Sequence, residues 1–308
     1  MTASTTTART ATAAPAAGSA RRRGTGDVYR LLPRPLQAVI IAILLCVALL
    51  PIVYVLLSSV NSDIGVASGE FFPSSFNLDN YVKVWSTVAL GNGLMNSVIV
   101  AGGVAIVCAF LAVATAYVLV RFSFRGRLTF LRSLLGLQSI PGTLMLLPVF
   151  VLFSSASSAL GIPIIGTRWS LFVTYLTFAL PFSTWVMVTY LRGLPRELEE
   201  AARIDGASSW RILTRIVLPL SWPGVVVSGI FAFLLGWNDV LFASVMTNPD
   251  TRTAAVALQV FTVAQEGGAL PLYGQMMAAS LICAVPVVAL YLVFQRYLVG
   301  GLTAGGVK

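Results

Sequence analysis

Long apolar runs separated by shorter polar stretches dominate the pattern along this chain. A helix needs about 20 apolar residues to cross about 30 Å of hydrocarbon. Six runs meet this length, at residues 37–59, 94–120, 130–153, 170–191, 219–246 and 273–298. The pattern therefore predicts an all-α integral membrane protein. It consists of a disordered tail at 1–36, a six-helix transmembrane domain at 37–298 and a short tail at 299–308.

Prolines interrupt several of these runs. Membrane helices tolerate such breaks where neighbouring helices satisfy the freed backbone groups. The prolines are consistent with bent helices around a pathway, although an ordinary packing kink is the commoner explanation of any single one. They are Pro51, Pro141, Pro148, Pro181, Pro223 and Pro286.

The composition agrees with a membrane protein and argues against an enzyme. Of the 308 residues, 57% are apolar and 10% are charged, whereas soluble domains average roughly 25% charged residues. The sequence contains no histidine, which is the commonest general base and metal ligand. Its three cysteines all lie in apolar runs and show no zinc-ligand spacing. We therefore expect no metal site, no disulfide framework and no catalytic activity.

The net charge of +9 comes from basic residues that are unevenly distributed. Seventeen of the twenty lie in the N-terminal tail, in the connections after the second and fourth runs, and at the C-terminal end. Because positively charged loops stay in the cytoplasm, both termini are expected there, and the charge requires no nucleic-acid partner. The long loops at 60–93 and 247–272 then face outward, where they meet an external partner or are simply solvated.

The connection at 192–216 carries a more specific pattern than a positively charged loop requires. Pro195 suits the first turn of a helix, and three glutamates follow it where the helix dipole favours acids. Gly206 is placed to end this helix in a left-handed conformation. Ser208 or Ser209 can then cap a second helix. We expect a short helix, a glycine corner and a second helix on the membrane surface.

The same connection resembles a known family signature. Glu200-Ala201-Ala202 is followed after three residues by Gly206, and after nine more by Ile216-x-Leu218-Pro219. This spacing is similar to the EAA-x3-G-x9-I-x-LP signature of ABC-importer permease subunits. The resemblance implies the type I ABC-importer permease fold, with residues 195–209 as a coupling helix that docks on a cytoplasmic ATPase subunit. It assigns ATPase coupling to Glu200, Ala201, Ala202, Asp205, Gly206, Ile216, Leu218 and Pro219.

Further segments narrow the resemblance, which covers residues 37–308. The segments "FNLDNYVKVW" and "GWNDVLFA" look like those of carbohydrate-type permeases. The C-terminal "YLVGGLTAGGVK" resembles the tail of the smaller permease subunit of maltose/maltodextrin transporters. In that family the tail inserts between the two ATPase subunits. The resemblance therefore implies a docking tail made of Gly301, Leu302, Thr303, Ala304, Gly305 and Gly306.

Asp239 is an acid within the fifth apolar run. A charge at the centre of a membrane helix costs about 2.5–3.5 kcal/mol on insertion scales and usually faces a cavity or a partner. One interpretation places Trp237, Asn238 and Asp239 on the translocation pathway, near bound sugar or the helix break that shapes the cavity. The other makes Asp239 a structural hydrogen-bond acceptor that holds a helix bend.

Together with the resemblance, these features predict the permease subunit of an ATP-driven sugar importer in a prokaryotic cytoplasmic membrane, with maltose, maltodextrin or a related oligosaccharide as the cargo. The sequence contains no G-x-x-x-x-G-K-[ST] loop, so ATP-Mg is expected on a partner ATPase dimer and no cofactor on this chain. The expected partners also include a second permease subunit, an external sugar-binding protein and membrane lipid. The alternative is an ion-coupled secondary transporter that uses Asp239 as a proton relay, although such proteins usually show internal repeats and several buried ionisable groups.

Overall fold

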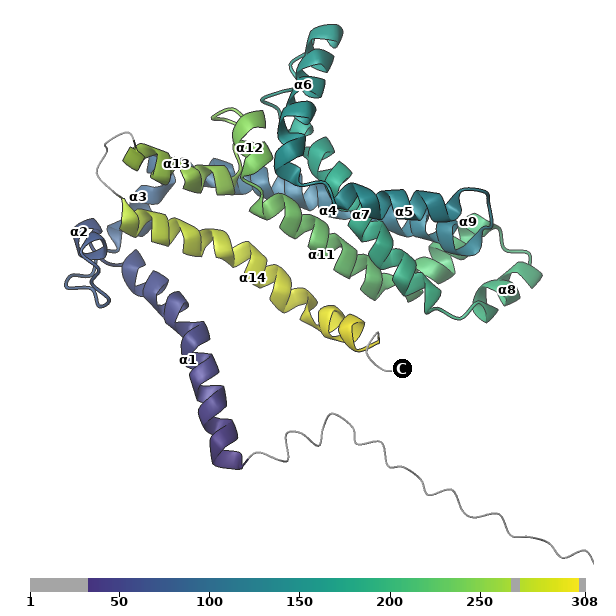
Figure 1. Ribbon diagram of the computed structural model, residues 1–308, viewed down its shortest axis with the longest axis horizontal. Coiled ribbons are helices and arrows are strands. Elements are labelled where there is room, and N and C mark those ends of the chain that lie inside the picture. Colours follow the sequence, from purple (N-terminus) through teal and green to yellow (C-terminus); the bar gives the residue numbers. More distant parts are fainter. Residues whose placement is uncertain (1–32, 267–271, 305–308) are drawn as a thin grey trace, which may run out of the picture. The chain divides into compact units, whose positions relative to one another are not determined.

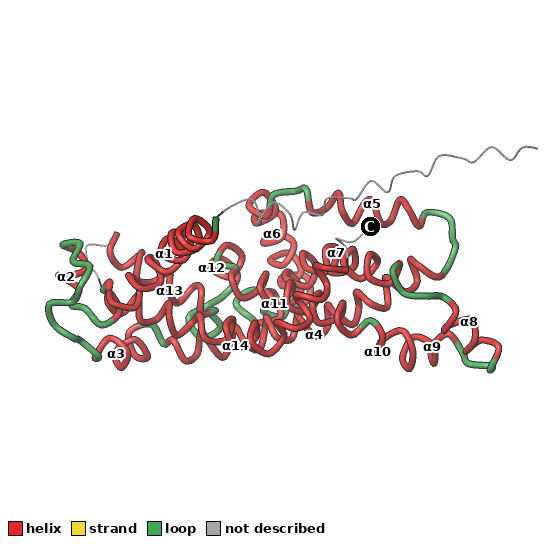
Figure 2. Tube along the Cα trace, turned by 90° about the horizontal axis from the view of Figure 1, so that it is seen from below, coloured by secondary structure: helices red, strands yellow, loops and turns green. Residues whose placement is uncertain are grey.

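The computed structural model describes residues 33–266 and 272–304, and every named element in these two ranges is a helix (Figures 1 and 2). The chain divides into two compact units, Met1–Ile52 and Val53–Lys308. The elements are α1 (Arg34–Ser59), α2 (Asp63–Ala67), α3 (Asp79–Thr87), α4 (Leu90–Arg121), α5 (Arg127–Gln138), α6 (Gly142–Leu160), α7 (Arg168–Arg192), α8 (Glu197–Ile204), α9 (Ser209–Ile212), the π-helical turn η2 (Leu213–Val217), α10 (Leu218–Leu220), α11 (Trp222–Asn238), α12 (Leu241–Met246), α13 (Ala254–Glu266) and α14 (Tyr273–Ala304).

Five helices of the described chain are long and apolar enough to cross a membrane, namely α1, α4, α6, α7 and α14. A sixth span results if Ser209–Leu220 and Trp222–Asn238 are counted together, although they are bent by 78°. The structure thus confirms the all-α membrane architecture. The first unit contributes the beginning of α1, whose large apolar side chains are exposed, as expected of a helix that faces lipid.

The third and fifth apolar runs are not the single helices that the sequence predicts. The run 130–153 is divided between α5 and α6, because Pro141 lacks an N–H and disfavours helical geometry at the residue before it. Within the run 219–246, the chain bends at Ser221 and helix α11 ends at Asn238. A separate helix, α12, then begins at Leu241. Elsewhere prolines cause no break: Pro51, Pro148, Pro181 and Pro286 lie inside continuous helices.

The segments outside the apolar runs also contain more helix than expected. The long loops carry α2, α3 and α13. The first helix begins at Arg34, within the predicted tail 1–36, and α14 continues through Ala304, beyond the predicted boundary at 298. Residues 1–32 lie outside the described part of the chain.

Helices α4, α7 and α11 form the centre of the second unit. Small side chains such as Ala112 and Ala116 of α4 are buried there and let the helices approach closely. Two glycines of α11 show how close this approach is. A Cβ at Gly224 would lie 2.8 Å from Cγ of Tyr190, and one at Gly236 would lie 2.9 Å from Cδ2 of Tyr175. Neither position has room for a larger residue.

The N-terminal part of α4 is tied to the segment between α12 and α13. The Asn96 amide donates to the carbonyl oxygens of Asp250 and Arg252, both at 2.9 Å, and its oxygen accepts from Arg168 Nε at 2.7 Å. The Ala254 N–H donates to Ser97 Oγ at 2.9 Å. At the other end of the second unit, α8 and α9 lie beyond the last turns of α4 and α7 (Figures 1 and 2). Helix α4 therefore runs between these two regions.

Candidate functional site

The charged connection folds as the sequence predicts, with one change at its start. Helix α8 begins at Glu197, two residues after Pro195, so Pro195 is not in its first turn. Arg196 is the N-cap residue and makes no side-chain capping bond. The first turn of α8 contains three glutamates, whose charge is favourable at the positive end of the helix dipole. We call Glu197–Leu220 the elbow.

Gly206 makes the corner of the elbow. Its φ of +79° lies in the left-handed region, which glycine adopts without steric cost. The Gly206 N–H donates to the Arg203 carbonyl at 3.0 Å, and the Ala207 N–H donates to the Ala202 carbonyl at 2.9 Å. These two bonds form a Schellman motif that satisfies the last carbonyls of α8. The predicted glycine corner is confirmed.

The second half of the elbow starts with a capped helix and ends in a bend. Ser208, one of the two expected caps, accepts the Arg211 N–H with its side chain. The π-helical turn η2 follows, and the chain bends at Ser221. The Ser221 hydroxyl donates to the Val217 carbonyl at 2.6 Å. The Val217 carbonyl also accepts the Ser221 N–H at 2.8 Å, so both donors of Ser221 bond to one carbonyl close to the break.

An ion pair that the sequence analysis missed fastens the elbow to α4. Arg121 Nε lies 2.7 Å from Glu199 Oε1, and the two side chains are only 4% and 6% exposed. A second Arg121 nitrogen donates to the Leu194 carbonyl at 3.4 Å. From the elbow side, Arg196 donates to the Val120 carbonyl at 3.5 Å. The sequence features that could have indicated this pair are the acid next to the signature glutamate and the arginine at the end of an apolar run.

The signature residues divide between an exposed and a packed group. Glu200, Ala201, Asp205, Gly206 and Pro219 are exposed, whereas Ala202, Ile216 and Leu218 are half-buried. Ala202 and Leu218 pack against the apolar core at this end of α4 and α7. Three large apolar side chains of the elbow are also exposed to solvent: Leu198 is 50% exposed, Trp210 72% and Ile204 87%. The elbow therefore has one face on the bundle and one face free.

The predicted docking tail falls only partly within the described structure. Gly301, Leu302, Thr303 and Ala304 belong to the last turn of α14. Gly305 and Gly306 lie outside the described residues.

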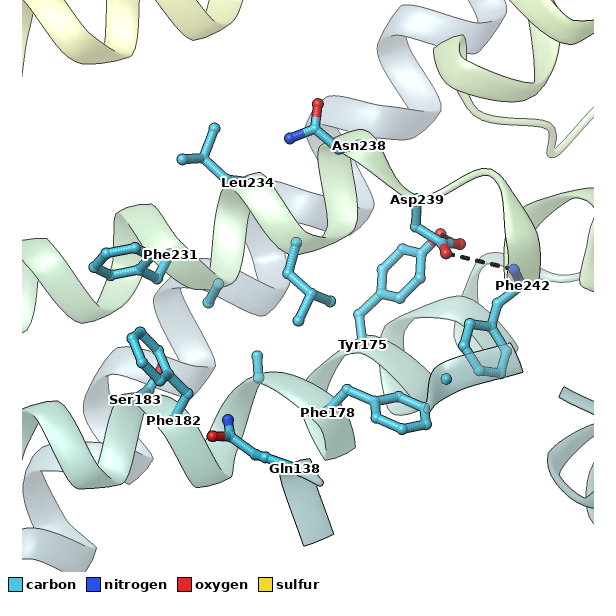
Figure 3. Close-up of a pocket in the computed structure, with 14 residues that line it drawn as sticks. Gln138, Tyr175, Phe178, Phe182, Ser183, Phe231, Leu234, Asn238, Asp239 and Phe242 are labelled. Carbon is cyan, nitrogen blue, oxygen red and sulfur yellow. Dashed lines mark hydrogen bonds between the residues drawn. The ribbon is translucent and has the colours of Figure 1, made fainter. Parts of the chain in front are cut away.

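The three residues expected on a pathway have different environments. Asp239 occupies the break between α11 and α12, where its Oδ2 accepts from the Tyr175 hydroxyl at 2.8 Å and from the Ala243 N–H at 3.0 Å. Its Oδ1 accepts from the Phe242 N–H, with oxygen and nitrogen 3.5 Å apart (Figure 3). Asp239 therefore acts as the hydrogen-bond acceptor that holds this break, as the second interpretation of the sequence expects.

Trp237 and Asn238 do not accompany Asp239 in that role. Trp237 is 5% exposed and stacks on Phe233, with ring centroids 5.2 Å apart. Asn238 is exposed and borders two cavities, of about 620 Å³ and about 360 Å³. Asp239 borders only the larger one, and Trp237 only the smaller one.

The larger cavity has walls that sequence reasoning did not identify. Figure 3 shows aromatic side chains from α7, α11 and α12 around it. Phe182 and Phe231 meet edge to face with centroids 4.9 Å apart, and Phe178 and Phe242 are 5.2 Å apart. These aromatics fall in ordinary apolar runs, so nothing in their spacing distinguishes them from core residues.

Comparisons with known proteins agree with this architecture. Residues 105–303 match the family described as "Binding-protein-dependent transport system inner membrane component". The trehalose/maltose transport system permease protein MalG of Thermococcus litoralis is 32% identical over 285 residues, covering 92% of this chain and 98% of that protein. The diacetylchitobiose uptake system permease protein NgcG of Streptomyces coelicolor is 32% identical over 261 residues, covering 84% of each.

A solved structure also shares the fold. A chain from the crystal structure of a bacterial ABC transporter involved in the import of the acidic polysaccharide alginate matches with a TM-score of 0.71 and 22% identity. The match covers 89% of this chain and 98% of that one. The fold of the elbow and the long apolar helices are both consistent with the family match. This chain belongs to the family of inner membrane components of binding-protein-dependent transport systems, as a multi-pass membrane protein.

Proposed function

We propose that this chain is a permease subunit of an ATP-binding-cassette sugar importer, and that its elbow transmits the movement of a separate ATPase subunit to the membrane helices. The observation that carries the proposal is the division of the α8 surface. Glu199 is paired with Arg121, whereas Glu200 and Ala201 are exposed together with Ile204. A surface helix that is anchored on one side and offers apolar and acidic groups on the other suits a partner-docking role.

The basic residues support the orientation in this proposal. Their concentration in the N-terminal tail and in the connections before α5 and α8 favours a cytoplasmic position for both termini and the elbow. A partner ATPase dimer then binds ATP-Mg and contacts Glu200, Ala201 and the tail at 301–306. This chain itself carries out no catalysis. A second permease subunit completes the pathway, and an external sugar-binding protein delivers the cargo on the opposite side.

We assign maltose or a maltodextrin-type oligosaccharide as the cargo. Two observations support it: the resemblance of the tail "YLVGGLTAGGVK" to maltose-type permeases, and the similarity to a trehalose/maltose permease over most of both chains.

Transport would proceed by alternating access. Closure of the ATPase subunits displaces the elbow, and the membrane helices change from an inward-facing to an outward-facing state because the two states then differ in stability. The ion-coupled alternative has no support from the comparisons. Its proposed relay, Asp239, is engaged by Tyr175 and by the first turn of α12.

A cross-linking experiment tests the elbow's role. Ala201→Cys in a Cys46→Ser background places a thiol on the exposed face of α8, and Arg125→Cys supplies a matched exposed position in the connection between α4 and α5. We expect a short bifunctional reagent to link Ala201→Cys, and not Arg125→Cys, to the co-purified ATPase. Equal linking at both positions, or none at Ala201→Cys, would contradict the proposal.

Uptake into membrane vesicles distinguishes the energy source. Labelled maltotriose uptake should survive collapse of the proton gradient and stop when the ATPase is inactivated. The opposite pattern would favour ion coupling.

A further inference from the structure

The second half of the elbow meets α11 nearly at a right angle. The segment Ser209–Leu220, which consists of α9, η2 and α10, is bent by 78° from Trp222–Asn238. The 17 residues of α11 carry no charge. At about 1.5 Å per residue they measure about 25 Å, close to the roughly 30 Å of a hydrocarbon core. Because a spanning helix crosses the bilayer, a segment at 78° to it runs nearly parallel to the membrane surface. We call Ser209–Leu220 the in-plane segment.

The in-plane segment has one side packed on the protein. Ile212 and Val217 are buried in the apolar core at this end of α4 and α7, and Leu213 and Leu218 pack against the same core. The other side is exposed. A helix with one side fixed in this way keeps its opposite side at the boundary where the membrane span begins, which is the geometry of an interfacial helix.

An exposed tryptophan lies at each end of the in-plane segment. Trp210 is 72% exposed, and Trp222, the first residue of α11, is 43% exposed. Leu220 is 44% exposed between them. Tryptophan is enriched at the boundary between hydrocarbon and water, because its ring is apolar and its N–H needs a polar partner. Trp210 lies at the end distant from α11, so the boundary chemistry extends along the whole segment.

Two arginines lie on the same exposed side. Arg211 and Arg215 are four residues apart, the spacing that makes side chains neighbours on a helix. Both are exposed, and neither guanidinium has a hydrogen-bond or ion-pair partner among the described residues. The in-plane segment contains no acid. A guanidinium matches the oxygens of a phosphate group in a bidentate geometry, so the two arginines suit a phosphate-bearing partner.

The two halves of the elbow carry opposite charge, although they lie at the same end of the second unit (Figure 2). Residues 197–205 contain one arginine and four acids, of which Glu199 is paired with Arg121. Residues 209–220 contain two arginines and no acid. A surface whose charge attracts one half therefore repels the other. The acidic half is the one assigned to the ATPase, and the headgroups beside the start of α11 supply the negative charge that the basic half requires.

We propose that the in-plane segment is a membrane anchor that binds an anionic phospholipid, with Arg211 and Arg215 on the phosphate and Trp210 and Trp222 beside the upper acyl chains. The elbow then has two partners, a protein on its acidic half and lipid on its basic half. The leaflet supports the lever, because a segment held in the interface transmits a displacement of α8 to α11. This inference goes beyond the proposed function and does not depend on the cargo.

A labelled thiol tests where the segment lies. The full complex with its ATPase, partner permease and binding protein is reconstituted in vesicles of phosphatidylcholine and phosphatidylglycerol. Trp210→Cys in a Cys46→Ser background carries a bimane fluorophore, and Ala201→Cys on α8 is the matched control, since both positions are exposed. We expect lipids brominated on their acyl chains to quench the label at position 210 and not the label at position 201. Equal quenching at both positions, or none at position 210, would overturn the inference.

Charge removal tests the phosphate contact. Native mass spectrometry of the complex compares binding of phosphatidylglycerol and phosphatidylcholine. Arg211→Gln with Arg215→Gln should lower the preference for phosphatidylglycerol about fivefold for each arginine. Arg203→Gln removes an exposed arginine from α8 and should change this preference by less than about twofold. Arg211→Lys with Arg215→Lys keeps the charge and should retain most of it. An unchanged preference in the double glutamine variant would contradict the proposal.

Two further measurements define the ligand and the consequence of binding. Glycerol phosphate, which has the phosphate without acyl chains, should not displace the lipid, and displacement would indicate an anion site instead of an anchor. In vesicles of phosphatidylcholine alone, uptake per ATP hydrolysed should fall about fivefold or more relative to vesicles with phosphatidylglycerol. The double glutamine variant should give the lower value in both. Equal coupling in the two lipids would refute the supporting role of the leaflet.

The outcomes separate this inference from the proposed function. If Trp210→Cys cross-links to the ATPase and brominated lipid does not quench its label, the in-plane segment is a protein contact. The anchor is then wrong, and the permease assignment stands. Quenching and a phosphatidylglycerol preference in a chain that binds no ATPase would support the anchor and count against the proposed function.

Discussion

Arg121 and Glu199 form a buried ion pair, with Nε and Oε1 2.7 Å apart, between the last residue of α4 and the first turn of α8. Glu199 precedes the signature residue Glu200, yet the two side chains have opposite environments: Glu199 is buried and Glu200 is exposed. One glutamate therefore fixes the elbow to the membrane domain, and its neighbour is available to a partner.

Breaking this pair should damage both stability and transport. Arg121→Ala leaves a buried carboxylate unpaired, which typically costs about 3–5 kcal/mol. We expect a lower thermal midpoint for the purified complex and loss of ATP-driven uptake. The matched control is Asp79→Asn, because the Asp79–Lys83 pair is exposed at 70% and 58% and such pairs contribute about 0–1 kcal/mol. Equal midpoints for the two variants would contradict the assignment.

A double replacement separates the two roles of the pair. Arg121→Met with Glu199→Leu removes both charges and fills a similar volume, a change that is often neutral or stabilising for buried ion pairs. The thermal midpoint should therefore recover. Uptake should remain low if the pair transmits movement, and full recovery of uptake would show that only stability had been lost.

Substitution of Gly206 should uncouple transport from ATP hydrolysis. A β-branched residue at φ +79° is strained by about 1–2 kcal/mol or more, and no neighbouring atom lies within 4 Å of the added Cβ, so the effect is on the backbone of the corner. We expect Gly206→Val to insert in the membrane and retain ATPase association while sugar uptake falls. Asparagine tolerates the left-handed region, so Gly206→Asn should retain most uptake. Normal uptake by Gly206→Val would argue against the elbow as the coupling element.

Asp239 should be replaceable by an amide but not by an alkyl group. Asparagine keeps an oxygen that can accept from Tyr175 and Ala243, so Asp239→Asn should retain uptake within about a few-fold of the unmodified protein. Asp239→Leu leaves these donors without their acceptor, which typically costs about 1–3 kcal/mol, and should lower both the thermal midpoint and uptake. Loss of uptake in Asp239→Asn at an unchanged midpoint would instead indicate that the charge itself is required.

Two glycine-to-alanine changes should have opposite effects on stability. At Gly224 the added Cβ would lie 2.8 Å from the Tyr190 ring, so Gly224→Ala forces α7 and α11 apart and should lower the thermal midpoint. At Gly102 on α4 the Cβ meets nothing within 4 Å, and alanine favours the helix by about 0.5–1 kcal/mol. Gly102→Ala should therefore leave the midpoint equal or higher. A similar decrease for both variants would mean that the close approach at Gly224 is unimportant.

The sequence predicted the membrane class and the elbow because both depend on local chemistry. Apolar run length located the long helices, and Gly206 and Ser208 occupy the corner and cap positions expected of them. The breaks at Pro141 and Asp239 were harder to predict. Proline also lies inside continuous helices at Pro148 and Pro181, so its presence alone does not decide between a bend and a break.

The long-range relationships were not predictable from this single sequence. Arg121 and Glu199 are 78 residues apart, and each has a sufficient local explanation, as a charge that ends a membrane span or as an acid in a first helical turn. The same holds for the cavity. Phe182 and Phe231 are indistinguishable from core aromatics until the two helices that carry them are placed side by side.

Helix α4 connects distant parts of the second unit without interruption. It has 32 residues, which corresponds to about 48 Å at about 1.5 Å per residue. Near its start Asn96 clamps the carbonyl groups of Asp250 and Arg252, and at its last residue Arg121 clamps Glu199. A rigid helix held near both ends cannot change its length, so a force applied to one end must either tilt the whole helix or break the contacts at one end.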